Sequence, residues 1–285
     1  MSVGRAASGA ASPISRRRAG GRRAAAQLDI AAVTFDFGNT LVPVHREHLQ
    51  AVVERTAREV AERLGPFRVD AFLDAWREER ERQFAEDVPE LREVDVEQRV
   101  TRVLARLRGM AAPSPTERWD DIAAGRHSTD AERTDVVRAY SQAFVELVPA
   151  PTDVGPLLER LAGRFRLGVL SNWPLASTID RFVEAAGWDR HLAAVVVSQR
   201  VGTIKPDGAI FDAAARALGV PGPRILHVGD DWIADVVGAK RAGWHAAYLR
   251  DAQDGSPLPG SRPDRSVRAD IVLHRLSEIE GVLPR

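Results

Sequence analysis

Four short groups of polar residues each follow an apolar run along this chain, and the first is built around a carboxylate. Asp36 comes directly after the β-prone run at residues 30–35 and is followed by a turn at 37–40 that contains Gly38 and Asn39. A carboxylate at the end of a strand can act as a nucleophile and can also bind a metal, because Asp and Glu form covalent phosphoryl intermediates and are oxygen ligands. An Asp that only caps a turn has the same local pattern, so this group does not decide the chemistry by itself.

The second and third groups offer a hydroxyl and an ammonium. Ser171 and Asn172 follow the apolar residues 167–170, and Lys205 stands beside Pro206 in a rigid turn. A hydroxyl here can donate to a phosphoryl oxygen, and a fixed lysine can neutralise charge on phosphate and on a nucleophile. Ser-Asn pairs are also common in turns, and most single lysines are surface residues, so each group is weak evidence alone.

The fourth group contains three carboxylates, Asp230, Asp231 and Asp235, which follow the short β-prone run at 225–228. Acidic residues are also favoured where a helix begins, and this is the alternative explanation. Carboxylates gathered without a neighbouring cation are costly, however. A hard cation that prefers oxygen ligands, such as Mg²⁺, therefore explains this group better.

The elements that must hold these groups follow from the spacing of the apolar residues. After residue 149, short β-prone runs lie at 166–170, 192–197, 225–228, 246–249 and 271–273. Helical patterns separate them at about 153–163, 176–186, 207–218 and 232–242. This alternation predicts an α/β fold, a Rossmann-like doubly wound parallel sheet with right-handed crossovers. Ligands of such sheets bind at the carboxyl ends of the strands, where all four groups are expected.

The segment between the first strand and residue 149 has only helical patterns. We therefore expect an inserted all-helical cap domain at 45–149 and an α/β core made of 28–44 and 150–285. Residues 1–27 contain many arginines among Ala, Gly and Ser and no acidic residue. Such a segment cannot bury enough apolar surface to fold, so we expect a disordered basic tail, whose role the sequence does not indicate.

The overall composition excludes several classes of protein. Lys plus Arg and Asp plus Glu both number 40, so the net charge is zero and nothing favours nucleic acid or anionic membrane as a partner. The chain has no cysteine, which excludes disulfides, thiolate metal sites and a Cys nucleophile. No apolar run approaches the ~18 residues of a membrane span. We expect a cytoplasmic protein that is a monomer or a homodimer.

In this order, the four groups resemble the haloacid-dehalogenase-like (HAD) superfamily. The resemblance lies in the residues at 35–41, 170–172, 202–211 and 227–243, and the last two stretches are the most specific. It implies a Rossmann-like core with a helical C1-type cap. It also implies a phosphatase-like hydrolase that is dependent on Mg²⁺ and acts on a small phosphorylated metabolite.

The same resemblance implies a role for each residue of the four groups. Asp36 would attack phosphorus and form an aspartyl-phosphate, while Ser171 and Lys205 hold the phosphoryl oxygens. Thr40, Asn172 and Trp173 are expected to contact the substrate as well. The Mg²⁺ ligands are expected among Asp36, the backbone carbonyl of Gly38, Asp230, Asp231 and Asp235.

The chain departs from the superfamily at Gly38, where most phosphatases of this type carry a second Asp that serves as acid and base. General acid–base catalysis is worth ~10²–10⁴-fold, so the change leaves three explanations open. The substrate has a good leaving group, or a cap residue such as His45 or His48 replaces the Asp, or the protein is a non-catalytic phosphate-binding or regulatory relative. A 2-haloacid dehalogenase is the rival enzyme, and the acidic pair at 230–231 argues against it.

Overall fold

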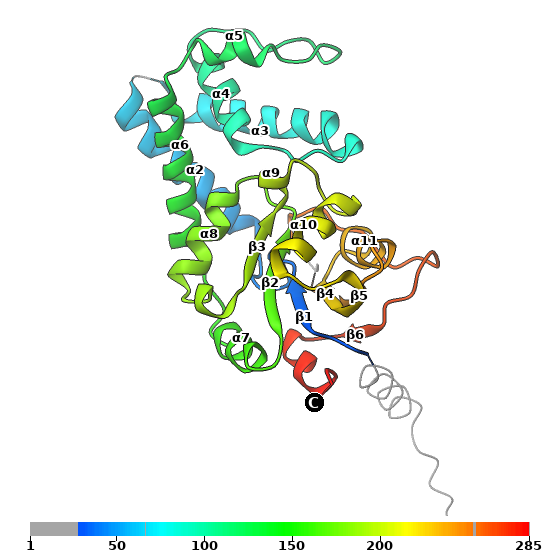
Figure 1. The fold of residues 1–285 in the computed structure, drawn as a ribbon. Helices are drawn as coiled ribbons and strands as arrows, with labels where there is room; N and C mark the ends of the chain where they lie inside the picture. Colours follow the sequence, from blue (N-terminus) through cyan, green and yellow to red (C-terminus); the bar gives the residue numbers. More distant parts are fainter. Residues whose placement is uncertain (1–27, 66, 253–254, 285) are drawn as a thin grey trace, which may run out of the picture.

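The computed structural model describes residues 28–65, 67–252 and 255–284, and Figure 1 shows them as a sheet with helices around it and a helical insert at one end. The basic tail predicted at residues 1–27 lies outside the described residues. Six parallel strands form one sheet in the order β3-β2-β1-β4-β5-β6. Their bounds are β1 Ala32–Phe35, β2 Arg166–Ser171, β3 Ala194–Val197, β4 Ile225–Gly229, β5 His245–Leu249 and β6 Ile271–Leu273.

Helical segments connect these strands and cover both faces of the sheet. They are α7 Val154–Ala162, α8 Ala176–Ala185, α9 Ser198–Val201, α10 Gly208–Leu218, the π-helix η4 Trp232–Val237 and α11 Gly238–Arg241. Short 3₁₀ turns complete the core: η2 Asp189–His191, η3 Gly222–Arg224 and η5 Leu276–Gly281. The prediction of a doubly wound parallel sheet is confirmed, because the strand order reverses direction between β1 and β4.

The strands are apolar on both faces because each face is packed. Val33 and Phe35 of β1 belong to one hydrophobic cluster, which also holds residues of α7 and α8, whereas Ala32 belongs to a second cluster with residues of α10 and η4. Side chains of a strand alternate between faces, so successive residues of β1 enter different clusters. This two-sided burial is why the strands read as continuous apolar runs in the sequence.

The described residues of the insert after β1 form helices joined by loops, with no strand among them, as the sequence indicates. It contains α2 Arg46–Leu64, α3 Val69–Glu86, the 3₁₀ turn η1 Val88–Glu90, α4 Val96–Leu107, α5 Asp121–Gly125 and α6 Asp130–Leu147. Figure 1 shows α3, α4 and α5 furthest from the sheet, with α2 and α6 running between them and the core. The division into core and cap at residues 44/45 and 149/150 stays a prediction.

One difference from the expected elements lies beside the fourth polar group. The helix expected at 232–242 is a π-helix, η4, followed by the short α-helix α11. The Val236 N–H donates to the Asp231 carbonyl, five residues back, which is the wide turn of a π-helix. No described helix has both the length and the apolar character needed to span a bilayer.

Candidate active site

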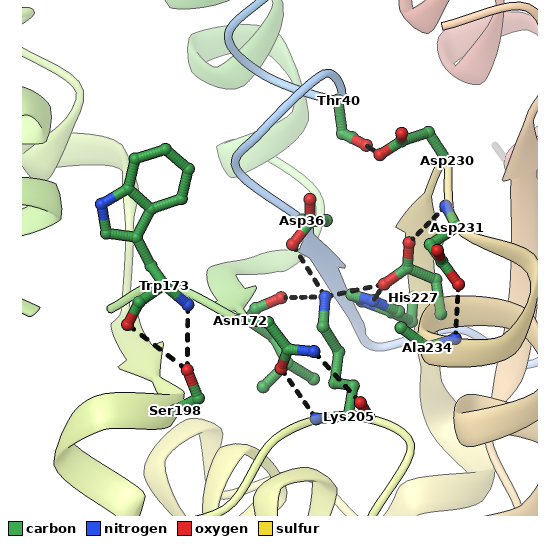
Figure 2. A network of polar contacts seen from close by, with 12 residues as sticks. Asp36, Thr40, Asn172, Trp173, Ser198, Lys205, His227, Asp230, Asp231 and Ala234 are labelled. Carbon is green, nitrogen blue, oxygen red and sulfur yellow. Dashed lines mark hydrogen bonds and ion pairs between the residues drawn. The ribbon is translucent and has the colours of Figure 1, made fainter. Parts of the chain in front are cut away.

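The polar groups meet where the strand order reverses. Asp36 directly follows β1, Ser171 ends β2 and Asp230 directly follows β4. Because β4 pairs with β1 in parallel register, and the Asp36 N–H donates to the Val228 carbonyl at 2.9 Å, the ends of these two strands are held together. Lys205 reaches the same edge of the sheet from the loop after α9, and Figure 2 shows it in the middle of the group.

The Lys205 ammonium is the centre of this network (Figure 2). It donates to Asp36 Oδ1 at 2.7 Å, to Asp235 Oδ1 at 2.7 Å and to the Leu170 carbonyl at 2.9 Å. All three of its N–H groups are therefore used, and the side chain is buried. Burial disfavours the charged ammonium, but the Asp235 and Asp36 carboxylates outweigh burial and raise the pKa of Lys205 above its usual value.

Asn172 holds the main chain of that lysine. Its Oδ1 accepts from the Lys205 N–H at 2.7 Å, and its Nδ2 donates to the Lys205 carbonyl at 3.1 Å. The peptide bond between Lys205 and Pro206 is cis. Both ends of the Asn172 amide thus act on the backbone of Lys205, so this side chain positions the lysine. The predicted contact of Asn172 with substrate is left untested by this arrangement.

Two successive hydrogen bonds link Asp235 to β4 and β1. Its Oδ1 lies 3.0 Å from His227 Nε2, and His227 Nδ1 lies 2.9 Å from Thr34 Oγ1. Burial lowers the pKa of His227, so its ring is neutral. An ionised carboxylate can only accept, which places the ring proton on Nε2 and makes Thr34 the donor to Nδ1. For Asp235, burial opposes the charged form, but Lys205 and His227 outweigh burial and lower its pKa.

A glycine makes room for this carboxylate at the end of β4. A Cβ placed on Gly229 would lie 2.1 Å from Asp235 Cγ, which no real side chain permits. The other oxygen of Asp235, Oδ2, accepts from the Asp231 N–H at 2.9 Å, so the side chain turns back onto the strand end. The close approach of Asp235 to the backbone therefore requires glycine at position 229.

The carboxylates of Asp36, Asp230 and Asp235 offer oxygens that all lie within 4.8 Å of one another. Asp230 accepts from Thr40 Oγ1 at 3.0 Å and from Asn39 Nδ2 at 3.4 Å. Burial, and then repulsion by Asp36 and Asp235, raises the pKa of Asp230 to about 8. For Asp36, burial raises the pKa more than the Lys205 ammonium lowers it.

This charge balance fits a divalent cation. With all three carboxylates ionised, three negative charges face the single positive charge of Lys205, and a group with charge +2 would cancel the excess. Lys205 bridges Asp36 to Asp235, and Figure 2 shows the second oxygen of Asp36 pointing away from the lysine. The acidic group is thus able to bind a metal through oxygen ligands.

Asp231 is outside this group of three carboxylates. Its Oδ1 accepts from the Ala234 N–H at 2.7 Å, as the N-cap of η4, and from Ser261 Oγ at 2.5 Å. The side chain therefore holds a helix start and a later loop together. A role for Asp231 in supporting a metal stays a prediction.

The turn after Asp36 is tight and carries its own polar contacts. Asn39 has a φ of +58°, a left-handed conformation that Asn tolerates better than most residues. The Phe37 carbonyl accepts from both the Leu41 and Val42 N–H groups, and the Asn39 N–H donates to Val42. This turn brings Asn39 and Thr40 to Asp230, to which both side chains donate.

Ser171 and Trp173 each present a buried polar atom. Within the described residues, neither Ser171 Oγ nor Trp173 Nε1 has a hydrogen-bond partner. A buried hydroxyl without a partner is uncommon and suits an absent acceptor such as a phosphoryl oxygen. The Trp173 ring packs against Phe37 at 5.4 Å and Phe144 at 5.3 Å between ring centroids, so it is part of the core as well as a wall beside Gly38.

Several residues of this site were missed in the sequence. His227 and Thr34 lie inside apolar strands at paired positions of β4 and β1, and a polar pair on one face of such runs was the only available signal. Leu258 contacts the turn at Gly38 from the loop between β5 and β6, and no local pattern in the sequence indicated this contact. His45 and His48, which the sequence offered as replacements for an acid at position 38, lie side by side where α2 begins, with ring centroids 5.3 Å apart, and that role stays a prediction.

Comparisons with known proteins agree with this geometry. A family profile described as haloacid dehalogenase-like hydrolase matches residues 30–243. Pyrimidine 5'-nucleotidase YjjG of Escherichia coli is 32% identical over 142 residues, which are 46% of this chain and 62% of that protein. Glyceraldehyde 3-phosphate phosphatase of Methanopyrus kandleri is 30% identical over 115 residues, 40% of this chain and 49% of that protein. The chain thus spans less than two thirds of the length of these relatives.

Solved structures share the fold over nearly their whole length. The 2-haloacid dehalogenase of Pseudomonas syringae pv. Tomato DC3000 superposes with a TM-score of 0.60 and 25% identity, covering 89% of this chain and 97% of that one. A HAD phosphatase from Thermococcus onnurineus superposes with a TM-score of 0.54 over 88% and 96% of the two chains, at 19% identity, which speaks for the fold alone. With the profile matching most of its length and the four polar groups at one edge of the sheet, this chain belongs to the haloacid dehalogenase-like hydrolase family.

Proposed function

We propose that this protein is a Mg²⁺-dependent hydrolase of small phosphate monoesters that works through an aspartyl-phosphate on Asp36. The observation that carries the proposal is the meeting, at the strand ends, of three carboxylates, one ammonium and one buried hydroxyl that has no hydrogen-bond partner among the described residues. Nucleophile, charge neutralisation and a donor for the phosphoryl group are the components that phosphoryl transfer requires.

In the first step, an oxygen of Asp36 forms a bond to phosphorus while the bond from phosphorus to the leaving oxygen breaks. The departing oxygen takes the bonding electron pair and then takes a proton from solvent water. In the second step, water attacks phosphorus, the carboxylate of Asp36 leaves, and inorganic phosphate is released. The hydrogen bond from Lys205 holds Asp36 in a fixed orientation, which supports its role as nucleophile.

Residues around Asp36 are suited to hold the phosphoryl oxygens. Ser171 ends β2 beside the Leu170 carbonyl to which Lys205 donates, and its hydroxyl is buried with its hydrogen-bonding capacity unused in the described residues. We propose that it donates to a phosphoryl oxygen, and that Thr40 and Trp173 line the same space. The Lys205 ammonium supplies a fixed positive charge near the transferred group.

We propose that Mg²⁺ is held by Asp36, the Gly38 carbonyl and Asp230, with Asp235 supporting the site through Lys205 and the Asp231 backbone. The ion would neutralise charge on the phosphoryl oxygens and on the carboxylates. The cluster of oxygens within 4.8 Å supports this proposal. The raised pKa of Asp230 supports it as well, because burial and then repulsion by Asp36 and Asp235 disfavour the Asp230 carboxylate when no cation is bound.

The relatives support the substrate class but do not identify the substrate. Two of them are named as phosphatases of small molecules, a pyrimidine 5'-nucleotidase and a glyceraldehyde 3-phosphate phosphatase. We therefore propose a small phosphorylated metabolite as substrate.

The test is phosphate release from a panel of sugar, nucleotide, aryl and acyl phosphates, with Mg²⁺ and with excess chelator. We expect release that requires Mg²⁺ and that falls to background in Asp36→Asn, which keeps the size of the side chain but removes the nucleophile. Turnover without metal, or an active Asp36→Asn variant, contradicts the proposal.

A 2-haloacid dehalogenase is the second candidate, because the Pseudomonas syringae structure with this activity in its name shares 25% identity and the whole fold. Such an enzyme attacks carbon and needs no metal, so it gains nothing from the acidic group around Asp230. Halide release from 2-haloacids in the presence of chelator, dependent on Asp36, would favour the dehalogenase over the phosphatase.

A further inference from the structure

The segment of residues 255–266, which we call the Leu258 loop, is anchored on both sides of the proposed active site. At its start, Ser256 Oγ donates to the Val44 carbonyl at 3.3 Å and accepts from the Leu258 N–H at 3.2 Å. Val44 directly precedes the residue that caps α2, so this anchor is on the connection between the sheet and the helical insert.

The second anchor is on the η4 side. Ser261 Oγ donates to Asp231 Oδ1 at 2.5 Å and accepts from the Ile233 N–H at 2.7 Å. Trp232 Nε1 donates to Asp264 Oδ1 at 3.0 Å. The Leu258 loop therefore bridges the two segments that follow β1 and β4, and it crosses the edge of the sheet at which Asp36 and Asp230 lie.

This bridge brings Leu258 to the turn after Asp36. Apart from atoms of Gly38 and its two chain neighbours, the three heavy atoms nearest to a Cβ placed on Gly38 are Leu258 Cδ1 at 2.6 Å, Trp173 Cζ3 at 3.4 Å and Val44 Cγ2 at 4.0 Å. All three atoms are carbon. Leu258 is half-buried and packs against the cluster that contains Val44 and Trp173. The space in front of position 38 is thus filled with apolar side chains.

We propose that Leu258 determines substrate choice in the hydrolase proposed above. Its apolar side chain borders the site at Gly38, so that only phosphates of good leaving groups are cleaved efficiently. This inference rests on the proposed phosphatase function. An apolar wall offers no proton to a departing oxygen, and Gly38 itself has no side chain to offer one.

The chemistry defines the class of substrate. When the bond from phosphorus to the leaving oxygen breaks without a proton donor, the oxygen departs with the electron pair as an anion and takes its proton from water afterwards. Its departure is then easier the weaker a base it is. Acyl phosphates, anomeric sugar phosphates and aryl phosphates have such leaving groups, whereas phosphates of simple alcohols do not.

The experiment measures kcat/KM for phosphate monoesters of graded leaving-group pKa, from activated aryl phosphates to alkyl phosphates. This quantity reports on the cleavage step rather than on hydrolysis of the aspartyl-phosphate. For the unaltered protein we expect kcat/KM to fall steeply as the leaving-group pKa rises. Equal values across the series would overturn the proposal, because they require a proton donor that acts on the leaving group.

Two variants place a carboxyl group at the apolar wall by independent routes. One is the pair Gly38→Asp with Leu258→Ala, in which the alanine makes room, and the other is Leu258→Glu. Leu258→Gln is the matched variant without an acid, and Ile122→Ala truncates an exposed apolar side chain in α5 as a control with unchanged activity. Thermal unfolding checks that each variant folds.

We expect the ratio of kcat/KM between activated aryl and alkyl phosphates to narrow about 10-fold or more in a variant with a carboxyl group, part of the ~10²–10⁴-fold that a positioned acid contributes. Leu258→Gln should leave the ratio unchanged. If every folded variant with a carboxyl group keeps the ratio of the unaltered protein, the wall at Leu258 does not limit the reaction. Absence of Asp36-dependent phosphate release from the whole series is a different result, and it contradicts the phosphatase function itself.

Discussion

At the scale of single residues, the site depends on one buried lysine that bridges two carboxylates. Lys205 bonds Asp36 and Asp235 at 2.7 Å each, and all three residues are largely removed from water. Three charges in such a place are stable only when their hydrogen bonds are complete. Lys205 meets that condition with the Leu170 carbonyl as its third acceptor.

Lys205→Met tests this dependence, because it removes the ammonium while keeping the length of the side chain. We expect a loss of about 3–5 kcal/mol in the free energy of unfolding, the cost of leaving a buried charge without its partner, together with loss of phosphate release. Chemical denaturation measures the first effect. Asp36→Asn is the control, which should lose activity with a smaller loss of stability. A Lys205→Met protein as stable as the unaltered one would show that Lys205 does not stabilise the two carboxylates.

Asp230 leads to a prediction about pH. Its pKa is raised to about 8 in the metal-free protein, so at neutral pH a proton occupies the carboxylate that Mg²⁺ would bind. We expect Mg²⁺ affinity to rise as the pH increases toward 8, by about tenfold per unit where one proton is displaced per ion, and to level off above it.

The free energy of unfolding of the metal-free protein depends on pH in the opposite direction to the Mg²⁺ affinity. Because the folded pKa of Asp230 exceeds its ordinary value of 3.8, its protonated form stabilises the fold at low pH, and this contribution is lost as the pH rises from 3.8 through about 8.

Calorimetric titration with Mg²⁺ at several pH values, with Asp230→Asn as control, measures the Mg²⁺ affinity. An affinity independent of pH between 6 and 8 would show that Asp230 is not a ligand.

At the scale of elements, the junction of β4 with the π-helix η4 aims Asp235 back into the site. The wide turn of η4 begins at Asp231, whose N–H donates to Asp235 Oδ2. Gly229, the last residue of β4, lies against that carboxylate, so strand end, turn and acidic residue form one unit.

Gly229→Ala should disrupt this unit. The added Cβ would meet Asp235 Cγ at 2.1 Å, so Asp235 must leave its contacts with Lys205 and His227. We expect phosphate release to drop by at least tenfold and the protein to lose about 1–3 kcal/mol of stability, as is usual for overpacking at a buried position. Gly208→Ala is the matched control, because nothing lies within 4 Å of its added Cβ. Equal activity of the two variants would contradict the account.

At the scale of the whole molecule, the sheet and the helical insert share one hydrophobic cluster. Phe72 and Trp76 of α3 and Phe144 of α6 belong to the same cluster as Phe35 and Phe37 at the end of β1. The Phe144 ring also lies 5.3 Å from that of Trp173, which follows β2. Contacts of this kind couple the two parts, whereas separate domains meet through smaller and more polar interfaces.

We therefore predict that core and insert unfold in one cooperative transition. Differential scanning calorimetry should give a calorimetric enthalpy equal to the van't Hoff enthalpy, and Phe144→Ala should lower the single midpoint, with a cost of about 3–5 kcal/mol. Two resolved transitions, of which Phe144→Ala shifts only one, would show that the insert folds on its own.

Much of this organisation follows from local sequence. The strands were predicted to within about two residues, because buried parallel strands between amphipathic helices have an apolar pattern that is hard to mistake. Parallel strands end at one edge of their sheet, so polar groups that follow them, such as Asp36, Ser171 and Asp230, must come together. The sequence alone therefore determined the fold, the edge that holds the site and the kinds of side chain found there.

The partner of each side chain at that edge was decided by the tertiary structure. Lys205 lies between Asp36 and Asp235, Asp231 turns to Ser261, and Leu258 arrives at Gly38 from a loop far along the chain. These contacts depend on how distant segments are placed relative to one another and on the competition of several acceptors for one donor. Local patterns of apolar and polar residues do not indicate the partner of each side chain, because that partner depends on hydrogen bonds and packing between segments that are distant in the sequence.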